Sequence, residues 1–524
     1  MSKIEILDST LRDGAQGFGV SYSVLDKLAI IKHLDNIGVD YIEAGNPASN
    51  PKDRELFEEL KKIELKNSKL AAFGATRRKN TKPEEDSNLK AILDAGTEVC
   101  VIFGKCWMLH VSNVLETTPE ENLNMIADSC RYLKAMGKKV IFDAEHFFDG
   151  YRDNRDYALA ALKTAQDNGA DTVVLCDTNG GTFPTEAIGI LWDVKTNITK
   201  AQVGVHFHDD CGMAVANSVL CAREGIAQIQ GTFIGNGERC GNANLSTIIP
   251  NLQLKLGIEC IPQDNLKKLT QTAREIASVD NADLDSKMPF VGGGAFTHKA
   301  GMHAAGVLKT PRSFEHVDPY LVGNERKFPT SEISGKAVIF ERVHEILPEL
   351  KKNSPESEKI LEELKRLENI GYQFEGADAS FELLVRRQMG LYKSYFELIN
   401  YRIFTGHDYG NEMVEPATAT VKTRVGDTVN LMASEGNGPI NALDKALRKS
   451  LLNFYPVLSE VELTDYKVRV LGSSNATAST VRVAITSTDG NNYFTTMGVS
   501  DDVVDASWKA LADSVNYFLL KRLG

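Results

Sequence analysis

Apolar runs and amphipathic stretches alternate regularly along the first half of the chain. Stretches with apolar residues at helical spacing, such as Val24, Leu28 and Ile31, separate the runs. The short β-rich runs recur eight times, at 4–8, 39–44, 70–75, 99–104, 140–144, 172–176, 203–207 and 229–234. Eight strand–helix units within about 256 residues predict a TIM (β/α)8 barrel. A doubly wound sheet usually has fewer strands and a G-x-G-x-x-G turn, which is missing here.

Helix-end signals support this interpretation. Thr118, Pro119 and Glu121 stand at the N-cap, N1 and N3 positions of a predicted helix. Glycines follow several of the amphipathic stretches, where a helix C-terminus favours left-handed backbone. These glycines are Gly38, Gly96, Gly137 and Gly169.

The pattern changes after the predicted barrel, which we assign to residues 1–265. Residues 266–400 are predicted to be mostly helical, with a highly charged helix over 351–369. Strands return in a C-terminal domain, 401–524, where an internal repeat is offset by 64 positions. The matching pairs are Ala442/Ala506, Lys445/Lys509, Ala446/Ala510, Leu447/Leu511, Ser450/Ser514 and Phe454/Phe518. A duplicated α+β unit suits a regulatory domain that binds a ligand, or one that only pairs subunits.

Composition narrows the class of protein. The net charge of -12 argues against nucleic acid as a partner, because phosphate binding needs a basic face. No apolar run approaches the roughly 18–20 residues of a membrane helix, and no signal peptide precedes the first predicted strand. The eight cysteines form no C-x-x-C pair, which favours free thiols in a reducing compartment. We therefore expect a cytoplasmic protein without a membrane segment.

Reactive and charged residues stand where the predicted strands end. A TIM barrel gathers all eight carboxyl ends of its strands at one face, where active sites are built. We therefore expect these side chains to converge, although they are spread over two hundred residues. They are Asp8, Arg12, Asp13, Glu43, Thr76, Arg77, Lys105, Glu145, Asp177, Thr178, His206, His208, Asn236 and Glu238.

A candidate metal site lies among them. His206 and His208 are two residues apart on a strand, so both imidazoles point to the same side. Asp13 would add a carboxylate after the first strand, and Asn242 an amide oxygen after the eighth. Such a set suits an octahedral Mg, Mn or Zn ion with positions open for substrate oxygens. The alternatives are an exposed histidine pair and a loop carboxylate that pairs with Arg12.

The chain resembles a superfamily of barrel metalloenzymes that carry an arginine–aspartate motif on their first strand. The resemblance begins at residues 8–16 and 206–209 and continues through 237–243 and 298–303, which resemble signatures of the 2-isopropylmalate, homocitrate and citramalate synthase branch. Further segments are similar to the citramalate synthase type and extend the match to the C-terminus. These are 73–79, 142–150, 176–182, 465–470 and 498–500.

The resemblance implies a Claisen-type condensation of acetyl-CoA, the co-substrate, with a 2-oxo acid. It implies that Arg12 stabilises the ketone oxygen or carboxylate of the 2-oxo acid, and that Thr178 holds the far carboxylate oxygen. Glu145 would enolise the acetyl methyl group, directly or through water. His303, from outside the barrel, would transfer a proton, with His298 as its rival. Such a histidine often comes from the partner subunit in this family.

Several of these roles have alternatives. Glu145 could form an ion pair with Lys105 or Arg77 at the barrel mouth. Arg77 could bind an anionic substrate group or balance the carboxylates. The family often places a tyrosine beside the histidine from outside the barrel, and here Tyr320 is merely near the matching stretch. His303 could also be a helix-packing residue.

Pyruvate is the predicted 2-oxo acid, giving (R)-citramalate at the entry of a threonine-independent isoleucine pathway. One methylene is typically worth about 1–3 kcal/mol in such a pocket. Few substitutions would thus switch the enzyme to 2-isopropylmalate or homocitrate synthesis. A lyase or carboxyltransferase on the same barrel is a more remote alternative, as is a non-catalytic regulator. The duplicated domain resembles a feedback domain and implies an isoleucine effector bound in a homodimer.

Overall fold

The computed structural model describes residues 3–280, 282–298, 301–328, 336–350, 354–374, 376–406, 416–471, 479–490 and 492–524. The chain divides into two compact units. The first holds Met1–Phe296 and Glu315–Arg326, and the second holds Thr297–Phe314 and Lys327–Gly524. Lys299 and Ala300, within the predicted 298–303 signature, lie outside the described residues. Among the described helices, none combines the length and apolar character needed to cross a membrane.

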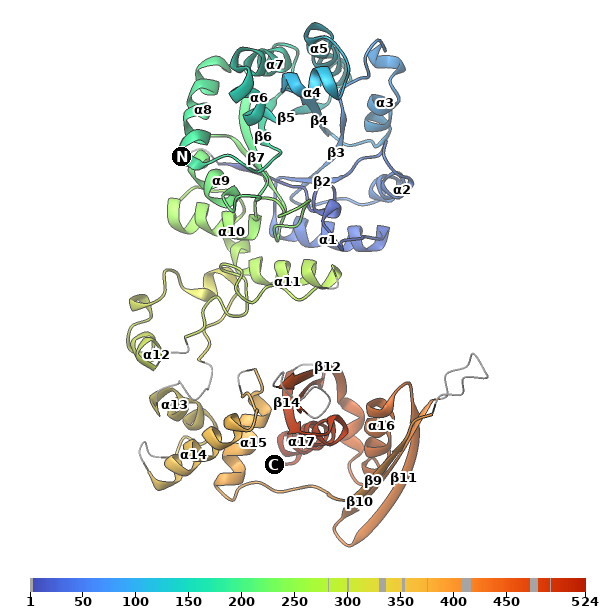
Figure 1. Ribbon diagram of the computed structural model, residues 1–524, viewed down its shortest axis with the longest axis vertical. Helices are drawn as coiled ribbons and strands as arrows, with labels where there is room; N and C mark the ends of the chain where they lie inside the picture. Colours follow the sequence, from blue (N-terminus) through green and yellow to red (C-terminus); the bar gives the residue numbers. More distant parts are fainter. Residues whose placement is uncertain are drawn as a thin grey trace. The chain divides into compact units, whose positions relative to one another are not determined.

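The first unit contains a closed barrel of eight parallel strands, which confirms the predicted fold (Figure 1). Ile6 of the first strand pairs with Ile229 of the eighth, and this closes the ring. Each observed strand overlaps its predicted run. The strands are β1 (Glu5–Asp8), β2 (Tyr41–Gly45), β3 (Lys69–Ala75), β4 (Val99–Lys105), β5 (Lys139–Glu145), β6 (Thr172–Asp177), β7 (Gln202–Phe207) and β8 (Gln228–Gly231).

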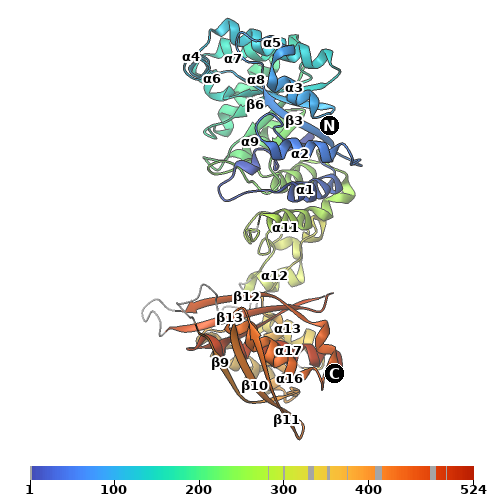
Figure 2. The ribbon, with the colours of Figure 1, turned by 90° about the vertical axis from the view of Figure 1, so that its right-hand side faces the viewer.

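Helices surround these strands (Figure 2). The predicted cap is present, because the Thr118 side chain accepts a hydrogen bond from the Glu121 N–H at 3.2 Å. Gly38 ends its helix in left-handed backbone with φ 87°. The helices of this unit are α1 (Val24–Ile37), α2 (Pro51–Leu60), α3 (Ser87–Asp94), α4 (Met108–Asn113), α5 (Pro119–Ala135), α6 (Phe147–Asp153), α7 (Arg155–Asp167), α8 (Pro184–Asn197), α9 (Ala214–Arg223), α10 (Leu245–Pro250) and α11 (Leu269–Val279).

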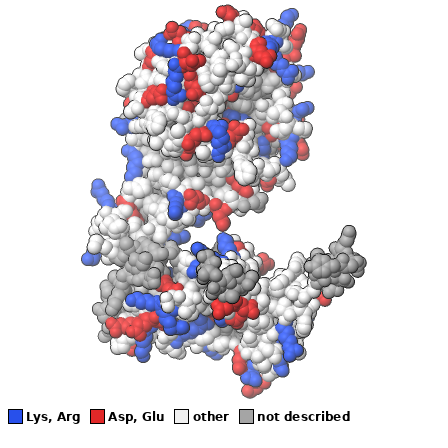
Figure 3. Space-filling model, in the orientation of Figure 1, with Lys and Arg blue, Asp and Glu red and all other residues white. Residues whose placement is uncertain are grey.

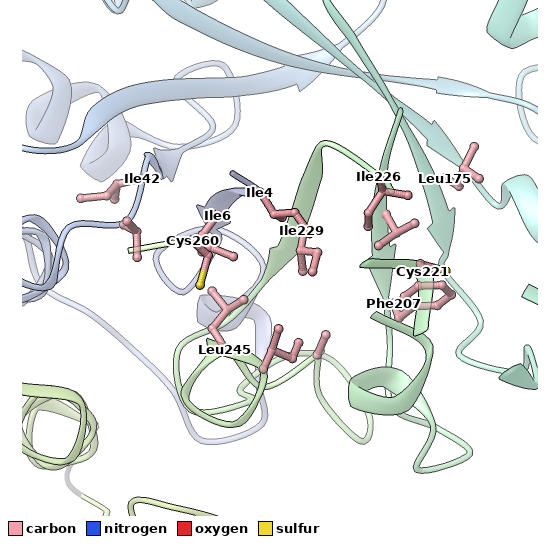
Figure 4. Close-up of a cluster of buried hydrophobic side chains, with 14 of the residues drawn as sticks. Ile4, Ile6, Ile42, Leu175, Phe207, Cys221, Ile226, Ile229, Leu245 and Cys260 are labelled. Atoms are coloured by element: carbon pink, nitrogen blue, oxygen red, sulfur yellow. The ribbon is translucent and has the colours of Figure 1, made fainter. Parts of the chain in front are cut away.

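Two apolar layers follow from the alternation of side chains along each strand. Ile6 and Phe207 belong to a large buried cluster between strands and helices, and Figure 4 shows part of it around β1, β7 and β8. Leu7 and Val174 belong to a smaller cluster in the barrel interior. Since Phe207 packs outward, its neighbours His206 and His208 are directed to the inside of the barrel.

The second unit contains helices and two similar three-stranded antiparallel sheets. Its helices are α12 (Gly301–Lys309), α13 (Lys336–Ile346), α14 (Pro355–Asn369), α15 (Asp378–Gln388), α16 (Pro439–Leu451) and α17 (Val503–Leu523). Its strands are β9 (Glu397–Phe404), β10 (Ala417–Val425), β11 (Thr428–Gly436), β12 (Glu462–Leu471), β13 (Thr480–Thr488) and β14 (Tyr493–Ser500). The predicted charged helix corresponds to α14, and residues 351–353 lie outside the described part.

The internal repeat is visible in this unit as two copies of three strands followed by a helix. The correspondence between the two copies extends to single hydrogen bonds. Thr423 bonds Ser450 between their hydroxyls at 3.2 Å, and Ser487 bonds Ser514 in the same way at 2.9 Å. Both residues of the second pair stand 64 positions after those of the first, so the predicted duplication is confirmed in three dimensions.

Both signs of charge are mixed over the visible face of the molecule (Figure 3). No single acidic field gathers on this face, although the full chain carries a net charge of -12.

Candidate active site

Asp13, His206 and His208 meet at the carboxyl ends of the barrel strands. The Asp13 Oδ2 atom lies 3.3 Å from His206 Nε2 and 3.8 Å from His208 Nε2. All three side chains are buried, and their candidate ligand atoms lie within 4.8 Å of one another. Residues almost two hundred positions apart in sequence thus present one carboxylate and two imidazoles to a common point.

Hydrogen bonds orient the first imidazole. His206 Nδ1 lies 3.0 Å from the Gln230 amide oxygen, and Gln230 Nε2 donates to Asp143 Oδ1 at 2.9 Å. Because an amide oxygen only accepts, the proton of the neutral His206 ring belongs on Nδ1. The lone pair is then on Nε2, which faces Asp13. This arrangement is typical of the outer hydrogen bonds that orient metal-binding histidines.

Burial and charge set the protonation of the cluster. Burial acts to raise the pKa of Asp13, but the Arg12 guanidinium and the two imidazoles hold it well below its usual range. Burial lowers the pKa of His208 to about 4, and the neighbouring His206 contributes to this shift. Near neutral pH the structure therefore provides an ionised carboxylate and, at His208, a neutral imidazole.

Asn242 is the fourth residue of the predicted donor set. Its Nδ2 donates to the Asn236 carbonyl at 3.2 Å, whereas its Oδ1 is buried and has no hydrogen-bond partner among the described residues. An isolated bridge between His208 and Asn242 holds the two segments together. A buried amide oxygen without a partner is costly unless something binds it. One carboxylate, two imidazoles and this oxygen fit a divalent cation.

Arg12 lies beside this cluster in a fixed position. Its Nε donates to Glu43 Oε2 at 2.7 Å, and its Nη1 to Asp13 Oδ2 at 3.0 Å. Its guanidinium carbon lies 3.8 Å from the centroid of the Phe73 ring. Glu43 is fully buried and also accepts a hydrogen bond from the Ser9 hydroxyl. Two carboxylates and one aromatic face therefore hold the guanidinium fork in one orientation.

A cavity of about 240 Å³ opens above these groups. Its lining includes seven of the residues that the sequence predicted to converge: Arg12, Asp13, Glu145, Thr178, His206, His208 and Glu238. Phe73 and Phe103, whose ring centroids lie 5.4 Å apart, form an aromatic wall. The cavity combines the candidate metal-binding cluster, a guanidinium and a carboxylate in one space.

Glu145 and Thr178 already have partners in the cavity. Glu145 forms an ion pair with Lys105, which is the alternative contact considered for it from the sequence. The Thr178 hydroxyl accepts a hydrogen bond from the His146 N–H at 2.9 Å. His146 adopts left-handed backbone with φ 54°, an uncommon conformation for a residue with a side chain. Lys105 and His146 thus fix the positions of the Glu145 carboxylate and the Thr178 hydroxyl.

The structure does not bring Arg77 to this cavity. Its guanidinium is buried against α5, where it forms ion pairs with Glu121 and Asp128, both at 2.8 Å. These contacts agree with the alternative considered from the sequence, in which Arg77 balances carboxylates.

The two candidate histidines from outside the barrel, His298 and His303, belong to the second compact unit. His303 is exposed and stacks on Phe314 with ring centroids 4.4 Å apart. Tyr320 belongs to the first unit and is largely exposed. The catalytic roles of these three residues stay predictions.

Asp143 and Gln230 take part in the site, although the sequence did not point to them. Glu43 was expected at this face but was given no role, and it holds Arg12. Asp143 and Gln230 lie inside strands, where a polar residue at an inward position is the only available signal. Burial, together with the nearby Glu43 carboxylate, raises the pKa of Asp143 to about 7. These buried groups orient Arg12 and His206.

Gly231 offers a test of how the barrel positions Asn242. A Cβ atom at Gly231 would collide with the Ala243 carbonyl, next to Asn242. We expect Gly231→Ala to lower the free energy of unfolding by about 1–3 kcal/mol, as overpacking usually does, and to weaken cation binding. Chemical denaturation and Mn²⁺ titration would measure the two effects. Gly189→Ala is the control, because nothing lies within 4 Å of its Cβ; equal effects of both changes would contradict the expectation.

Three family models match successive parts of the chain. The "HMGL-like" family matches residues 3–276, which include the barrel. The "Homocitrate synthase post-HMGL domain-like" family matches residues 290–371, and the "LeuA allosteric (dimerisation) domain" matches residues 375–519.

Curated relatives match over nearly the full length. The (R)-citramalate synthase of Aquifex aeolicus is 50% identical over 99% of this chain and 98% of its own length. The (R)-citramalate synthase of Geobacter sulfurreducens is 48% identical with the same coverage. The 2-isopropylmalate synthase of Methanocaldococcus jannaschii is 29% identical over 99% of this chain and 95% of its own length.

Proposed function

The chain belongs to the (R)-citramalate synthase family, and we propose on this basis that it condenses acetyl-CoA with pyruvate and water to (R)-citramalate and CoA. The proposal rests on the difference in sequence identity between this chain and two kinds of synthase. Two citramalate synthases share 50% and 48% of their residues with nearly the whole chain, whereas a 2-isopropylmalate synthase shares 29%. The chain is thus an acyltransferase in which an acyl group becomes an alkyl group on transfer.

Asp13, His206, His208 and Asn242 are the proposed ligands of a divalent cation, Mg, Mn or Zn. When bound, the cation supplies Lewis acidity to the ketone and carboxylate oxygens of the 2-oxo acid. The buried Asn242 Oδ1 without a partner, and the lone pair that Gln230 leaves on His206 Nε2, support this ligand set.

Arg12, Thr178 and Glu145 are the proposed residues that act on the substrates. Arg12 donates N–H groups toward the ketone oxygen, where negative charge develops as the new bond forms. Thr178 donates its hydroxyl to the substrate carboxylate, since its oxygen already accepts the His146 N–H. The Glu145 carboxylate takes a proton from the acetyl methyl group, and the electron pair of the C–H bond passes to the thioester oxygen as an enolate. The Lys105 ammonium, which pairs with Glu145, holds this carboxylate ionised before the transfer.

Free-thiol release tests this function. We expect release with acetyl-CoA and pyruvate, and slower release with 2-oxoisovalerate or 2-oxobutyrate. Removal of the cation by a chelator should stop the reaction, and addition of Mg²⁺ or Mn²⁺ should restore it. Preference for 2-oxoisovalerate would assign the chain to 2-isopropylmalate synthesis. Release that survives the chelator would contradict the role of the cation.

We also propose that the protein is a cytoplasmic homodimer in which His303 reaches the partner's cavity. The match to a dimerisation domain over residues 375–519 supports assembly. The exposure of His303 and its stacking on Phe314 leave the imidazole accessible to a second chain. All eight cysteines are free, and six of them are buried, which is compatible with a reducing compartment.

Isoleucine is the proposed feedback effector of the duplicated domain. We expect saturating L-isoleucine to reduce thiol release about fivefold or more, the lower range of allosteric coupling. D-isoleucine serves as the control, because a chiral site would reject it. If L-isoleucine leaves the rate unchanged, the duplicated domain acts in assembly alone.

A further inference from the structure

Helix α6 carries a carboxylate that contacts the residues next to two proposed active-site residues. The helix follows β5 after a single residue, His146, and packs against β6 (Figure 1). Asp149 Oδ2 accepts a hydrogen bond from Asn179 Nδ2 at 2.9 Å and lies 3.4 Å from His146 Nδ1. His146 follows Glu145 in the sequence, and Asn179 follows Thr178. One carboxylate oxygen therefore joins the two segments that present these active-site side chains.

Arg152 of the same helix extends this connection. Its Nη1 donates to Asp149 Oδ1 at 3.1 Å, and its Nη2 donates to the Thr182 hydroxyl at 2.9 Å. The Thr182 N–H in turn donates to Asp177 Oδ2 at 3.0 Å. Since Asp177 directly precedes Thr178, α6 holds the residues on both sides of this threonine.

The environment of Asp149 favours its ionised form. Burial acts to raise the pKa of Asp149, but the hydrogen bond with His146 and the charge of Arg152 bring it below its usual value. An ionised carboxylate only accepts hydrogen bonds, so the proton of a neutral His146 ring belongs on Nδ1. Hydrogen bonds to an ionised group are shorter and stronger than those between neutral groups. Asp149 therefore holds its partners more firmly than a neutral side chain would.

The backbone of His146 distinguishes this arrangement from an ordinary helix start. His146 has φ 54° and ψ 36°, in the left-handed region, and its side chain does not cap α6. In this conformation its N–H donates to the Thr178 hydroxyl at 2.9 Å. A residue with a side chain keeps such a conformation only where its surroundings enforce it. The His146 ring, which contacts Asp149 and packs on His110 with centroids 4.3 Å apart, provides this constraint.

We propose that Asp149 is a positioning residue of the condensation. Through the residues that follow them in sequence, it fixes the Glu145 carboxylate relative to the Thr178 hydroxyl. The inference rests on the proposed function, in which Thr178 binds the 2-oxo acid and Glu145 takes a proton from the acetyl group. The two reactants must meet at bonding distance, and a displacement of about 1 Å can cost about 10²-fold in rate. Asp149 does not line the catalytic cavity, so it acts through its neighbours.

Asp149→Ala should lower kcat about 10–100-fold and raise the KM for pyruvate about fivefold, because both active-site side chains are displaced. The KM for acetyl-CoA should stay within about twofold. Asp149→Asn should recover most of the lost rate, since its amide oxygen still accepts from His146 and Asn179. If Asp149 merely stabilised the first turn of α6, its loss would lower the melting temperature without this kinetic pattern.

Two substitutions at His146 test the backbone conformation, whether or not Asp149→Ala folds. Both remove the imidazole, but glycine adopts left-handed backbone freely and alanine does not. His146→Gly should therefore have a kcat about fivefold or more above that of His146→Ala. Equal rates in the two variants would show that the left-handed conformation does not position Thr178, which contradicts the proposal.

Asp193→Ala is the matched control. Asp193 of α8 accepts hydrogen bonds from Tyr151 of α6 at 2.6 Å and from Arg155 at 2.7 Å, and none of the three lines the catalytic cavity. This variant should lose stability but keep kcat and both KM values within about twofold. Equal kinetic changes in Asp149→Ala and Asp193→Ala would overturn the inference.

The same assay separates this inference from the proposed function. If the wild-type protein releases no thiol with any 2-oxo acid, the proposed function itself fails. Wild-type turnover with unaltered kcat and pyruvate KM in Asp149→Ala refutes only the positioning role.

Discussion

Replacing His208 by alanine should lower the rate of thiol release by about 10³-fold or more, equivalent to losing several kcal/mol of transition-state stabilisation. The change leaves only the Asp13 carboxylate and the His206 imidazole at the buried point where the three groups meet. The affinity for Mn²⁺, measured by calorimetry at equal protein concentration, should fall in parallel. The two measurements together distinguish loss of the cation from loss of a catalytic proton donor.

His33→Ala is the control for this experiment, because His33 lies on α1 and does not line the catalytic cavity. It should retain both Mn²⁺ affinity and turnover. A His208→Ala protein that binds Mn²⁺ as the wild type does would show that the cluster is not the cation site.

The barrel could be predicted because its strands are apolar on both faces and end in recognisable turns. The largest difference concerns the last strand, predicted over 229–234 and observed as Gln228–Gly231. Thr232 leaves the barrel ladder, since its N–H donates to the Ala243 carbonyl and it bridges with Asn244. The apolar run continues through Phe233, which is buried outside the sheet. Hydrophobicity alone does not distinguish a residue buried within a barrel strand from one buried outside the sheet.

The convergence of Asp13, His206 and His208 could be predicted because strand polarity and side-chain alternation fix where each residue points. Arg77 shows the limit of that reasoning. Arg77 directly precedes Arg78. Its backbone N–H donates to the Ser129 hydroxyl, and its side chain points to α5, where it donates to a carboxylate. Beyond the strand end, alternation no longer applies, and only the loop conformation decides which arginine faces a cavity. Gln230 was missed for a different reason, since an amide inside a strand carries no charge to signal a site.

Arg12→Lys should reduce kcat by about 10²–10³-fold, the range seen when one oxyanion-stabilising donor is removed, with little change in Mn²⁺ affinity. Lysine keeps the positive charge but not the planar fork that binds Glu43 and Asp13 at once and stacks on Phe73. The ammonium can satisfy Glu43 or approach the substrate, and it cannot do both from one position. Steady-state kinetics with saturating acetyl-CoA and pyruvate would measure the loss.

Arg77→Lys is a matched substitution at a second buried arginine with two carboxylate partners, Glu121 and Asp128. It should lower the melting temperature without a comparable fall in kcat, because its guanidinium lies outside the catalytic cavity. Equal kinetic losses in the two variants would mean that the barrel responds to any weakened buried ion pair. A loss confined to Arg12→Lys would instead tie catalysis to the donor geometry at this one position, since the charge and the two carboxylate partners are matched in the comparison.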